Sequence, residues 1–175
     1  MTAPRIDLDT LNTLGADAFS AVLAGIFEHS AWIARAAWSA RPFASVAALH
    51  ATMVSVVTNS GAERQLALLR AHPELARPGP LTAASTAEQG GMGLDRLAAD
   101  EAAAFDRLNT EYRTRFGFPF IIAVRGQRDR AAILAALSAR MRHDPEQERV
   151  AALAEVAKIA RFRLDDLIMP QPHGN

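Results

Sequence analysis

Apolar residues recur at helical spacing along most of this chain, whereas the alternation that is typical of strands is scarce. Alanine, leucine and arginine dominate, and all three favour helix. Half of the 175 residues are hydrophobic, which is enough for a sizeable core. The sequence therefore predicts an all-α fold, a compact helical bundle in which residues 1–175 form a single domain. One predicted apolar stripe comprises Phe19, Val22, Leu23, Ile26 and Phe27.

Capping patterns predict where several helices begin. The string DPEQ at 144–147 combines a cap, a first-turn proline and a capping-box partner, so it predicts the start of the last helix. Pro73 disfavours helical backbone in the residue before it, and an earlier helix should therefore end near His72. The other predicted caps are Ser30, Ser45, Asp129, and the first members of the pairs Ser60–Glu63 and Ser85–Glu88.

Residues 116–126, FGFPFIIAVRG, are the exception to the helical pattern. The stretch is aromatic, β-branched and bounded by glycines, features that suit a buried strand. The sequence offers no second strand with which it could pair, and a lone strand cannot satisfy its backbone inside a core. We therefore expect one extended segment, at about 117–125, that lines a pocket and directs free N–H and C=O groups at a ligand.

The charge balance and the absence of cysteine exclude several classes of function. Lys+Arg and Asp+Glu both number 19, so the formal net charge is zero and no basic field attracts nucleic acid. Without cysteine there is no disulfide, thiol nucleophile or Cys–metal site. The sequence shows neither an apolar signal core nor a stretch long enough to span a membrane. We expect a cytoplasmic protein with no nucleic-acid partner and no membrane partner.

His72 is the first candidate for chemistry. It is expected at the C-terminal end of a helix, where the carbonyl dipoles favour the imidazolium form, and Pro73 restricts its backbone. Such a histidine is suited to act as an acid near neutral pH, the more so beside a carboxylate. The alternative is a structural histidine that only caps the last carbonyls of the helix.

Glu88 and Gln89 lie in the second candidate stretch, STAEQGGMG at 85–93. A structural interpretation stays open here as well, because Ser85 and Glu88 have capping-box spacing. Gln89 and three nearby glycines exceed what a cap requires, and glycines let a small polar ligand approach the backbone. The stretch is not a phosphate loop, since it lacks the Lys-Ser/Thr ending and a preceding strand.

Metal and hydrolase chemistry have little support in the sequence. No two of the five histidines have the i, i+4 spacing of a helical metal pair, and no nucleophile elbow is visible. His143 and Asp144 are expected to form a cap at a helix junction, and we expect no metal. Arg161 and Arg163 lie two positions apart late in the last helix, so at most one of them should point into a given pocket.

A series of motifs resembles the 2-oxo-4-hydroxy-4-carboxy-5-ureidoimidazoline (OHCU) decarboxylase family, from about Phe19 to Leu167. The motifs are LLRAHPELA at 68–76, STAEQGGMGL at 85–94, LNTEYRTRFGFPF at 108–120, AVRG at 123–126 and IARFRL at 159–164. Two features depart from the family pattern. Glu74 stands where aspartate is more usual, and the link between the first two motifs is short.

The resemblance implies an all-helical homodimer that removes the carboxylate of OHCU, a small ureidoimidazoline, to give (S)-allantoin in urate degradation. It also implies that no metal or organic cofactor takes part. By position, the family's catalytic histidine corresponds to His72, and we expect Glu88 to share a proton with it. The substrate-binding residues that the resemblance implies are Pro73, Ser85, Gln89, Phe120, Ile121, Ile122 and Arg163.

Two other functions remain as alternatives. In the first, the chain is a non-enzymatic helical interaction module in which His72, Ser85 and Glu88 are only helix caps. In the second, it is a metal-dependent helical hydrolase that uses His143 and Asp144 together with distant histidines.

Overall fold

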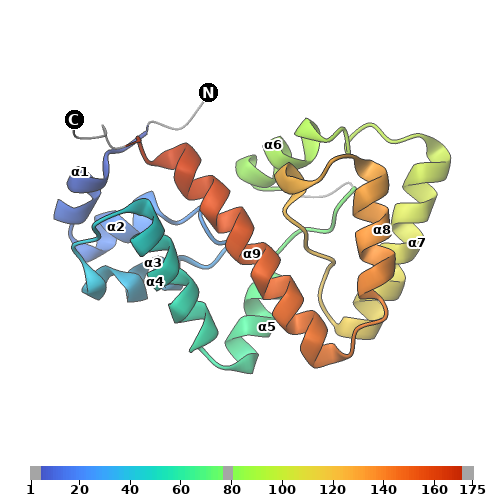
Figure 1. Ribbon diagram of the computed structural model, residues 1–175, viewed down its shortest axis with the longest axis horizontal. Helices are drawn as coiled ribbons and strands as arrows, with labels where there is room; N and C mark the ends of the chain where they lie inside the picture. The colour runs from blue at the N-terminus through green and yellow to red at the C-terminus, as the bar shows by residue number, and fades with distance from the viewer. Residues whose placement is uncertain (1–4, 77–80, 171–175) are drawn as a thin grey trace. The chain divides into compact units, whose positions relative to one another are not determined.

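The computed structural model describes residues 5–76 and 81–170. In these ranges every regular element is helical, and the predicted all-α fold is confirmed (Figure 1). Residues 77–80, in the short link between the first two family motifs, lie outside the described residues. No helix of the described part has both the length and the apolar character needed to cross a membrane. The helices are α1 (Leu8–Thr13), α2 (Ala16–Val22), α3 (Ala31–Ala37), α4 (Val46–Thr58), α5 (Ala62–Arg70), α6 (Ala83–Gly91), α7 (Ala99–Phe116), α8 (Arg130–Arg140) and α9 (Pro145–Leu167), with 3₁₀ helices η1 (Trp38–Ala40) and η2 (Val124–Gly126).

The chain divides into two compact units, and the divisions fall inside α5 and α9. Unit 1 comprises Met1–Gln65 and Ala157–Asn175, and unit 2 comprises Leu66–Val156. In unit 1, α3 packs against both α2 and α4. Phe19, Ile33 and Met53 from these three helices are fully buried and form the centre of its core.

The predicted stripe at 19–27 is buried, but it is not one helix. α2 ends at Val22, and the residues after it form turns, in which the Ile26 N–H donates to the Leu23 carbonyl at 3.1 Å. Leu23, Ile26 and Phe27 still reach the core of unit 1. Helical spacing therefore identified four of the five side chains correctly as buried, with Val22 only half-buried, while the tighter turns after Val22 were missed.

Several of the predicted helix starts are confirmed. Ser30 precedes α3 as predicted, but its side chain makes no capping hydrogen bond. Ser45 and Asp129 cap α4 and α8, and each side chain accepts a backbone N–H three residues further on. Asp144 and Gln147 exchange the two hydrogen bonds of a capping box at the start of α9. The expectation for Ser60 is wrong, because its hydroxyl donates to a carbonyl of the preceding helix.

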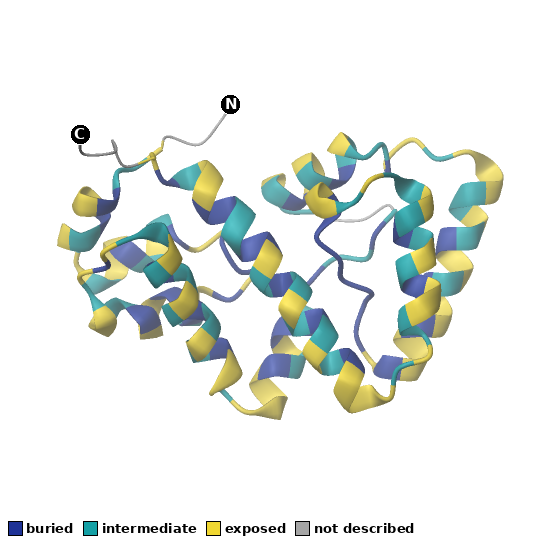
Figure 2. Cartoon of the chain, viewed as in Figure 1, coloured by how far each residue is buried: buried dark blue, intermediate teal, exposed yellow. Residues whose placement is uncertain are grey.

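In unit 2, α7 packs against α8 and buries one face along its length (Figure 2). Three phenylalanine rings surround Tyr112 on that face, with centroids 4.7 to 5.9 Å from its own ring. Such tilted and edge-on aromatic pairs add to the stability that burial provides. The face consists of Phe105, Asn109, Tyr112 and Phe116, and the other two rings of the cluster are Phe118 and Phe120.

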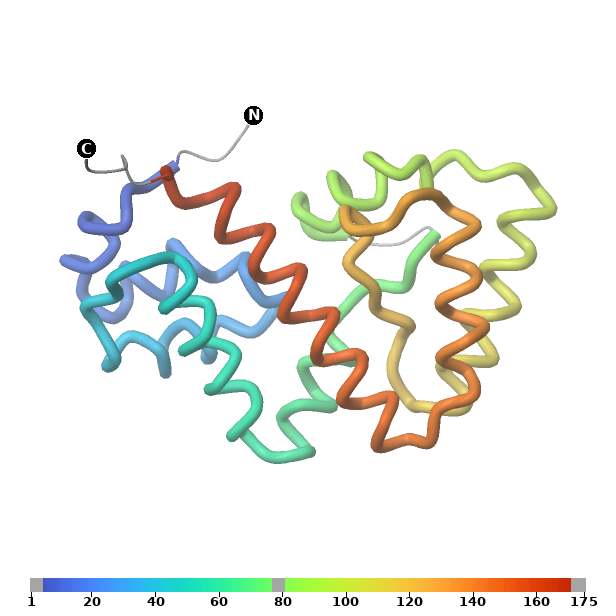
Figure 3. The backbone as a smooth tube through the Cα atoms, viewed as in Figure 1, coloured from blue at the N-terminus to red at the C-terminus, as the bar shows by residue number. Residues whose placement is uncertain are grey.

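The predicted extended segment is present directly after α7. Gly117 ends that helix with a positive φ of 77°, a conformation that glycine adopts without strain. The backbone then runs without helical coil through residues 118–123, as Figure 3 shows between α7 and α8. It is slightly shorter than expected, because residues 124–126 already form the turn η2. In the described ranges this segment pairs with no strand.

Candidate functional site

His72 lies just beyond the C-terminal end of α5, as its proline neighbour predicted. Its side chain is buried, and Nδ1 is 2.9 Å from the carbonyl oxygen of Leu68. A carbonyl oxygen only accepts, so Nδ1 must carry a proton in this contact. Nε2 is therefore the ring atom at which a proton can be gained or lost. The histidine therefore caps the end of the helix through Nδ1.

Ser85, Glu88 and Gln89 lie on one face of α6, because residues three and four positions apart on a helix are neighbours. Ser85 and Gln89 are buried, whereas Glu88 is half-buried. The expected cap was placed wrongly: Thr82 is the N-cap, and its hydroxyl oxygen accepts the Ser85 N–H at 3.2 Å. Ser85 thus belongs to the first turn of the helix.

Gln89 fastens the loop that follows His72 to this face of α6. Its Oε1 accepts the Ala76 N–H at 3.0 Å, and its Nε2 donates to the Glu74 carbonyl at 3.4 Å. Both ends of the amide therefore hold backbone of the loop 73–76. Gln89 therefore holds α6, which also carries Ser85 and Glu88, against the loop that follows His72.

A second helix supports the same loop, and this support was not predicted from the sequence. Asn109 of α7 donates from Nδ2 to the Leu75 carbonyl at 2.8 Å. From the next turn of α7, Arg113 forms a 2.6 Å ion pair with Glu74. Ala76 completes the loop with a φ of 57°, a conformation that non-glycine residues seldom adopt.

The extended segment contributes buried backbone to unit 2. Phe120, Ile121 and Ile122 are each at most 5% exposed. Among the described residues no acceptor engages the backbone N–H of any of these three. By contrast, the Ala123 N–H donates to Glu155 Oε2 at 2.8 Å. The turn η2 that follows packs against α6, so the segment ends beside the helix that carries Glu88.

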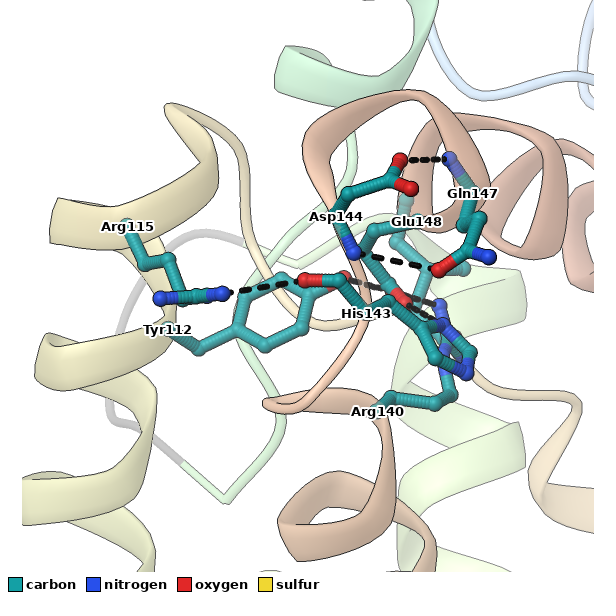
Figure 4. A network of polar contacts seen from close by, with 8 residues as sticks. Tyr112, Arg115, Arg140, His143, Asp144, Gln147 and Glu148 are labelled. Atoms are coloured by element: carbon teal, nitrogen blue, oxygen red, sulfur yellow. Dashed lines mark hydrogen bonds and ion pairs between the residues drawn. The ribbon is translucent and has the colours of Figure 1, made fainter.

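A buried polar network also holds the extended segment (Figure 4). Glu148, which is fully buried, accepts hydrogen bonds from Tyr112 and Arg140, the latter through Nε at 2.8 Å. Its second oxygen lies 2.7 Å from Nδ1 of His143. Arg140 reaches further and donates from Nη1 to the Ile121 carbonyl at 2.7 Å. The network links α7, α8, α9 and the segment within unit 2.

This network perturbs the ionisation of Tyr112. Burial and the hydrogen bond to Glu148 raise the pKa of its phenol well above the ordinary value of 10.0. The folded state therefore keeps this proton at a pH where the unfolded chain loses it. It follows that the associated stability is complete below pH 10 and is lost as the pH rises further.

Tyr112 is the single tyrosine of the chain, so alkaline titration of the absorbance reports on it alone. We expect no tyrosinate absorbance from the folded protein at pH 10, and its appearance only together with unfolding, followed by circular dichroism. The urea-unfolded chain is the control and should titrate near the ordinary pKa of 10.0. A tyrosinate signal with that midpoint in the folded protein would contradict the buried contact.

Arg163 lies in unit 1, whereas the other predicted site residues lie in unit 2. Its side chain is 7% exposed, and Nη1 donates to Glu28 Oε2 at 2.8 Å and to the Gly25 carbonyl at 3.1 Å. Arg161, two positions earlier, is half-exposed and pairs with Asp165. The two arginines thus face different surroundings, as their spacing predicted. The substrate-binding role of Arg163 stays a prediction.

The described residues contain no group of three or more His, Asp or Glu side chains arranged to hold a metal ion. In the hydrolase alternative His143 would be a ligand, but its Nδ1 faces Glu148 and Asp144 caps α9. A shallow depression lies on α4, and none of the predicted site residues lines it.

The chain is similar throughout its length to known proteins. The family model described as OHCU decarboxylase matches residues 12–165. A 2-oxo-4-hydroxy-4-carboxy-5-ureidoimidazoline decarboxylase of Haloferax volcanii is 43% identical over 160 residues, which cover 91% of this chain and 95% of the relative. A uric acid degradation bifunctional protein of Bacillus subtilis is 41% identical over 161 residues, or 92% of this chain and 32% of that protein.

A solved structure has the same fold. The crystal structure of an (S)-allantoin synthase superimposes with a TM-score of 0.76 at 34% sequence identity. The match covers 93% of this chain and 54% of that chain, so this chain spans about half the length of the solved protein. The alignments include the stretches that carry His72, Glu88 and the extended segment, because the family match extends across both units.

Proposed function

The chain belongs to the OHCU decarboxylase family and is therefore a decarboxylase, and we propose that it converts 2-oxo-4-hydroxy-4-carboxy-5-ureidoimidazoline to (S)-allantoin and CO₂. The observation that carries the proposal is the contact of Gln89 with the loop after His72. It joins the helix end that bears the histidine to the helix face that bears Glu88. The name of the Bacillus subtilis relative, a uric acid degradation protein, supports a place in urate degradation.

The reaction breaks the bond between the ring carbon and its carboxylate. That carbon also carries the hydroxyl, so the electron pair of the broken bond forms a double bond to the neighbouring, ureido-bearing carbon and displaces the pair of that carbon's C=N bond onto the ring nitrogen. The hydroxyl then becomes the carbonyl of allantoin and its proton goes to the ring nitrogen, while His72 and Glu88, which share a proton, deliver it to one face of the ureido-bearing carbon. That carbon is the stereocentre of the product, so one-sided delivery yields a single stereoisomer. Nε2 of His72 is the exchanging atom, since Nδ1 is bound to the Leu68 carbonyl. In such a coupled pair the proton belongs to both groups.

Backbone donors of the extended segment stabilise the negative charge that develops as CO₂ leaves. The buried N–H groups of Phe120, Ile121 and Ile122 are the candidates, because no acceptor among the described residues engages them. Donors that are fixed before the reaction need no rearrangement when charge appears, and one such donor is typically worth about 10²–10³-fold in rate. Ser85, Gln89 and Pro73 bind the ring and ureido group beside them.

Arg163 orients a polar substrate group through the forked geometry of its guanidinium. Glu28 holds it in place. We further propose that residues 1–175 act as one domain, in a homodimer, in the cytoplasm, and without metal or organic cofactor. The family match over residues 12–165 includes both units, which supports a single functional domain.

Binding of the product separates this proposal from the interaction module. A ligand that binds only the folded state raises the stability by RT ln(1 + [L]/Kd), about 2.7 kcal/mol at 100 times Kd. We expect (S)-allantoin to raise the thermal midpoint of the protein in a concentration-dependent manner, and (R)-allantoin to do so less. Equal midpoints with and without either enantiomer, at concentrations up to tens of millimolar, would favour a protein that only uses His72 and Glu88 as caps.

A further inference from the structure

Arg140 is the one side chain of the buried network that binds the backbone of the extended segment. It is the last residue of α8, and its side chain is 11% exposed. Nη1 donates to the Ile121 carbonyl at 2.7 Å, and the guanidinium lies 4.7 Å from the centroid of the Phe120 ring. Arg140 therefore holds both the side chain of one residue and the carbonyl of the next.

The carbonyl of Ile121 and the N–H of Ile122 belong to the same peptide group. That group is planar and trans, so the two bonds point in opposite directions. A contact that fixes the carbonyl also fixes the direction of the N–H. The following peptide is fixed as well, because the Ala123 N–H donates to Glu155 at 2.8 Å. The backbone on both sides of Ile122 is thus held by charged side chains.

A cation on the carbonyl also makes the N–H of the same peptide a stronger donor. Hydrogen bonds in series polarise one another, and a charged donor has a larger effect than a neutral one. The Ile122 N–H is buried and meets no acceptor among the described residues. The Ile122 N–H can therefore donate a strong hydrogen bond to a bound molecule that carries or develops negative charge.

The remaining network fixes Arg140 itself. Glu148 binds Nε and Nη2 of the guanidinium, and Tyr112 donates to the same carboxylate oxygen. The third nitrogen, Nη1, is the one that reaches Ile121. An arginine held by two nitrogens presents its third donor in one direction, which a lysine with a single nitrogen cannot reproduce.

From these contacts we infer that Arg140 is a positioning residue for the decarboxylation: through the Ile121 carbonyl it aims and strengthens the Ile122 N–H that faces the reacting substrate. The inference rests on the proposed function. Arg140 would thus affect the rate of decarboxylation without touching the substrate. Glu148 and Tyr112 act with it by holding the guanidinium in place.

The test compares Arg140→Lys with a matched control, Arg128→Lys. Arg128 also pairs with a carboxylate, Asp129 at 3.0 Å, but its side chain is 86% exposed. We expect Arg140→Lys to lower kcat by about tenfold and to change KM by less than about threefold, because the affected contact matters most in the transition state. The control should keep both constants.

Nuclear magnetic resonance supplies a readout that a structural role alone would not move. The amide resonance of Ile122 should shift between the wild-type protein and Arg140→Lys, and should respond to (S)-allantoin in the wild type more than in the variant. If Arg140→Lys does not fold, the double variant Arg140→Met with Glu148→Gln removes both buried charges together and takes its place.

A folded Arg140 variant with wild-type kcat would overturn the inference, and so would an Ile122 resonance that is the same in both proteins. A wild-type protein without decarboxylase activity would instead refute the proposed function. In that case the amide resonance of Ile122, compared between the wild-type protein and Arg140→Lys without ligand, still shows whether Arg140 affects this N–H. The two failures are therefore distinguishable.

Discussion

Replacing His72 by asparagine is expected to lower kcat for carboxylate removal by about 10²–10⁴-fold while the protein stays folded. Asparagine can still donate a hydrogen bond to the Leu68 carbonyl, which Nδ1 of the histidine holds at 2.9 Å. It has no group that takes up or releases a proton near neutral pH. The variant thus keeps the cap at the end of α5 and removes the proposed proton transfer.

His50→Asn is the matched control for this substitution. His50 is likewise a histidine whose ring binds a backbone carbonyl, with Nε2 at 2.7 Å from the Ala157 oxygen in unit 1. Its replacement should lower the thermal midpoint slightly and leave kcat unchanged. Steady-state rates and the denaturation midpoint are measured for both variants. If His72→Asn keeps the wild-type kcat, the histidine is a helix cap and the proposed mechanism is wrong.

Glu28→Ala is expected to destabilise the protein by about 3–5 kcal/mol, since it leaves the Arg163 guanidinium buried without its carboxylate partner. Both side chains of this pair are at most 7% exposed. A loss of this size is a large share of the stability of a typical domain. Glu28→Gln should cost less, because its amide oxygen can still accept a hydrogen bond from Nη1. Urea denaturation followed by circular dichroism measures the change.

Asp17→Ala is the control for this second prediction. Asp17 also pairs with an arginine in unit 1, Arg35, but the two side chains are 91% and 63% exposed. Water screens such a pair, and its removal should change the free energy of unfolding by less than about 1 kcal/mol. Equal losses for Glu28→Ala and Asp17→Ala would show that burial of the Glu28–Arg163 pair has no energetic consequence.

Local patterns in the sequence were sufficient to predict most of the helices and the extended segment, although α1 and the turns after Val22 were missed. Asp129 and Ser45 were recognised as caps because a cap involves residues only three positions apart. The same reasoning failed at Ser85, because the N-cap is Thr82, three residues earlier, which is also a residue type that favours this position. The sequence alone cannot distinguish two cap candidates that lie three residues apart, since the choice depends on how the start of the helix packs in the folded protein.

The support of the site could not be predicted, because it depends on contacts between distant positions. Tyr112 and Glu148 are 36 residues apart, and Asn109 and Leu75 are 34 apart. Glu148 lies in the first turn of α9, where an acidic residue is ordinarily explained by the helix dipole. Nothing in its immediate neighbourhood indicates that it is fully buried between α7 and α8.

The handedness of the allantoin formed from freshly generated OHCU tests the central claim most directly. OHCU is produced from urate in the assay itself, and the circular dichroism of allantoin is followed over time. The account predicts that the wild-type protein yields (S)-allantoin faster than the uncatalysed reaction, and that His72→Asn and Glu88→Gln largely abolish this gain. Racemic allantoin at the uncatalysed rate with the wild-type protein, or wild-type rates for both variants, would contradict it.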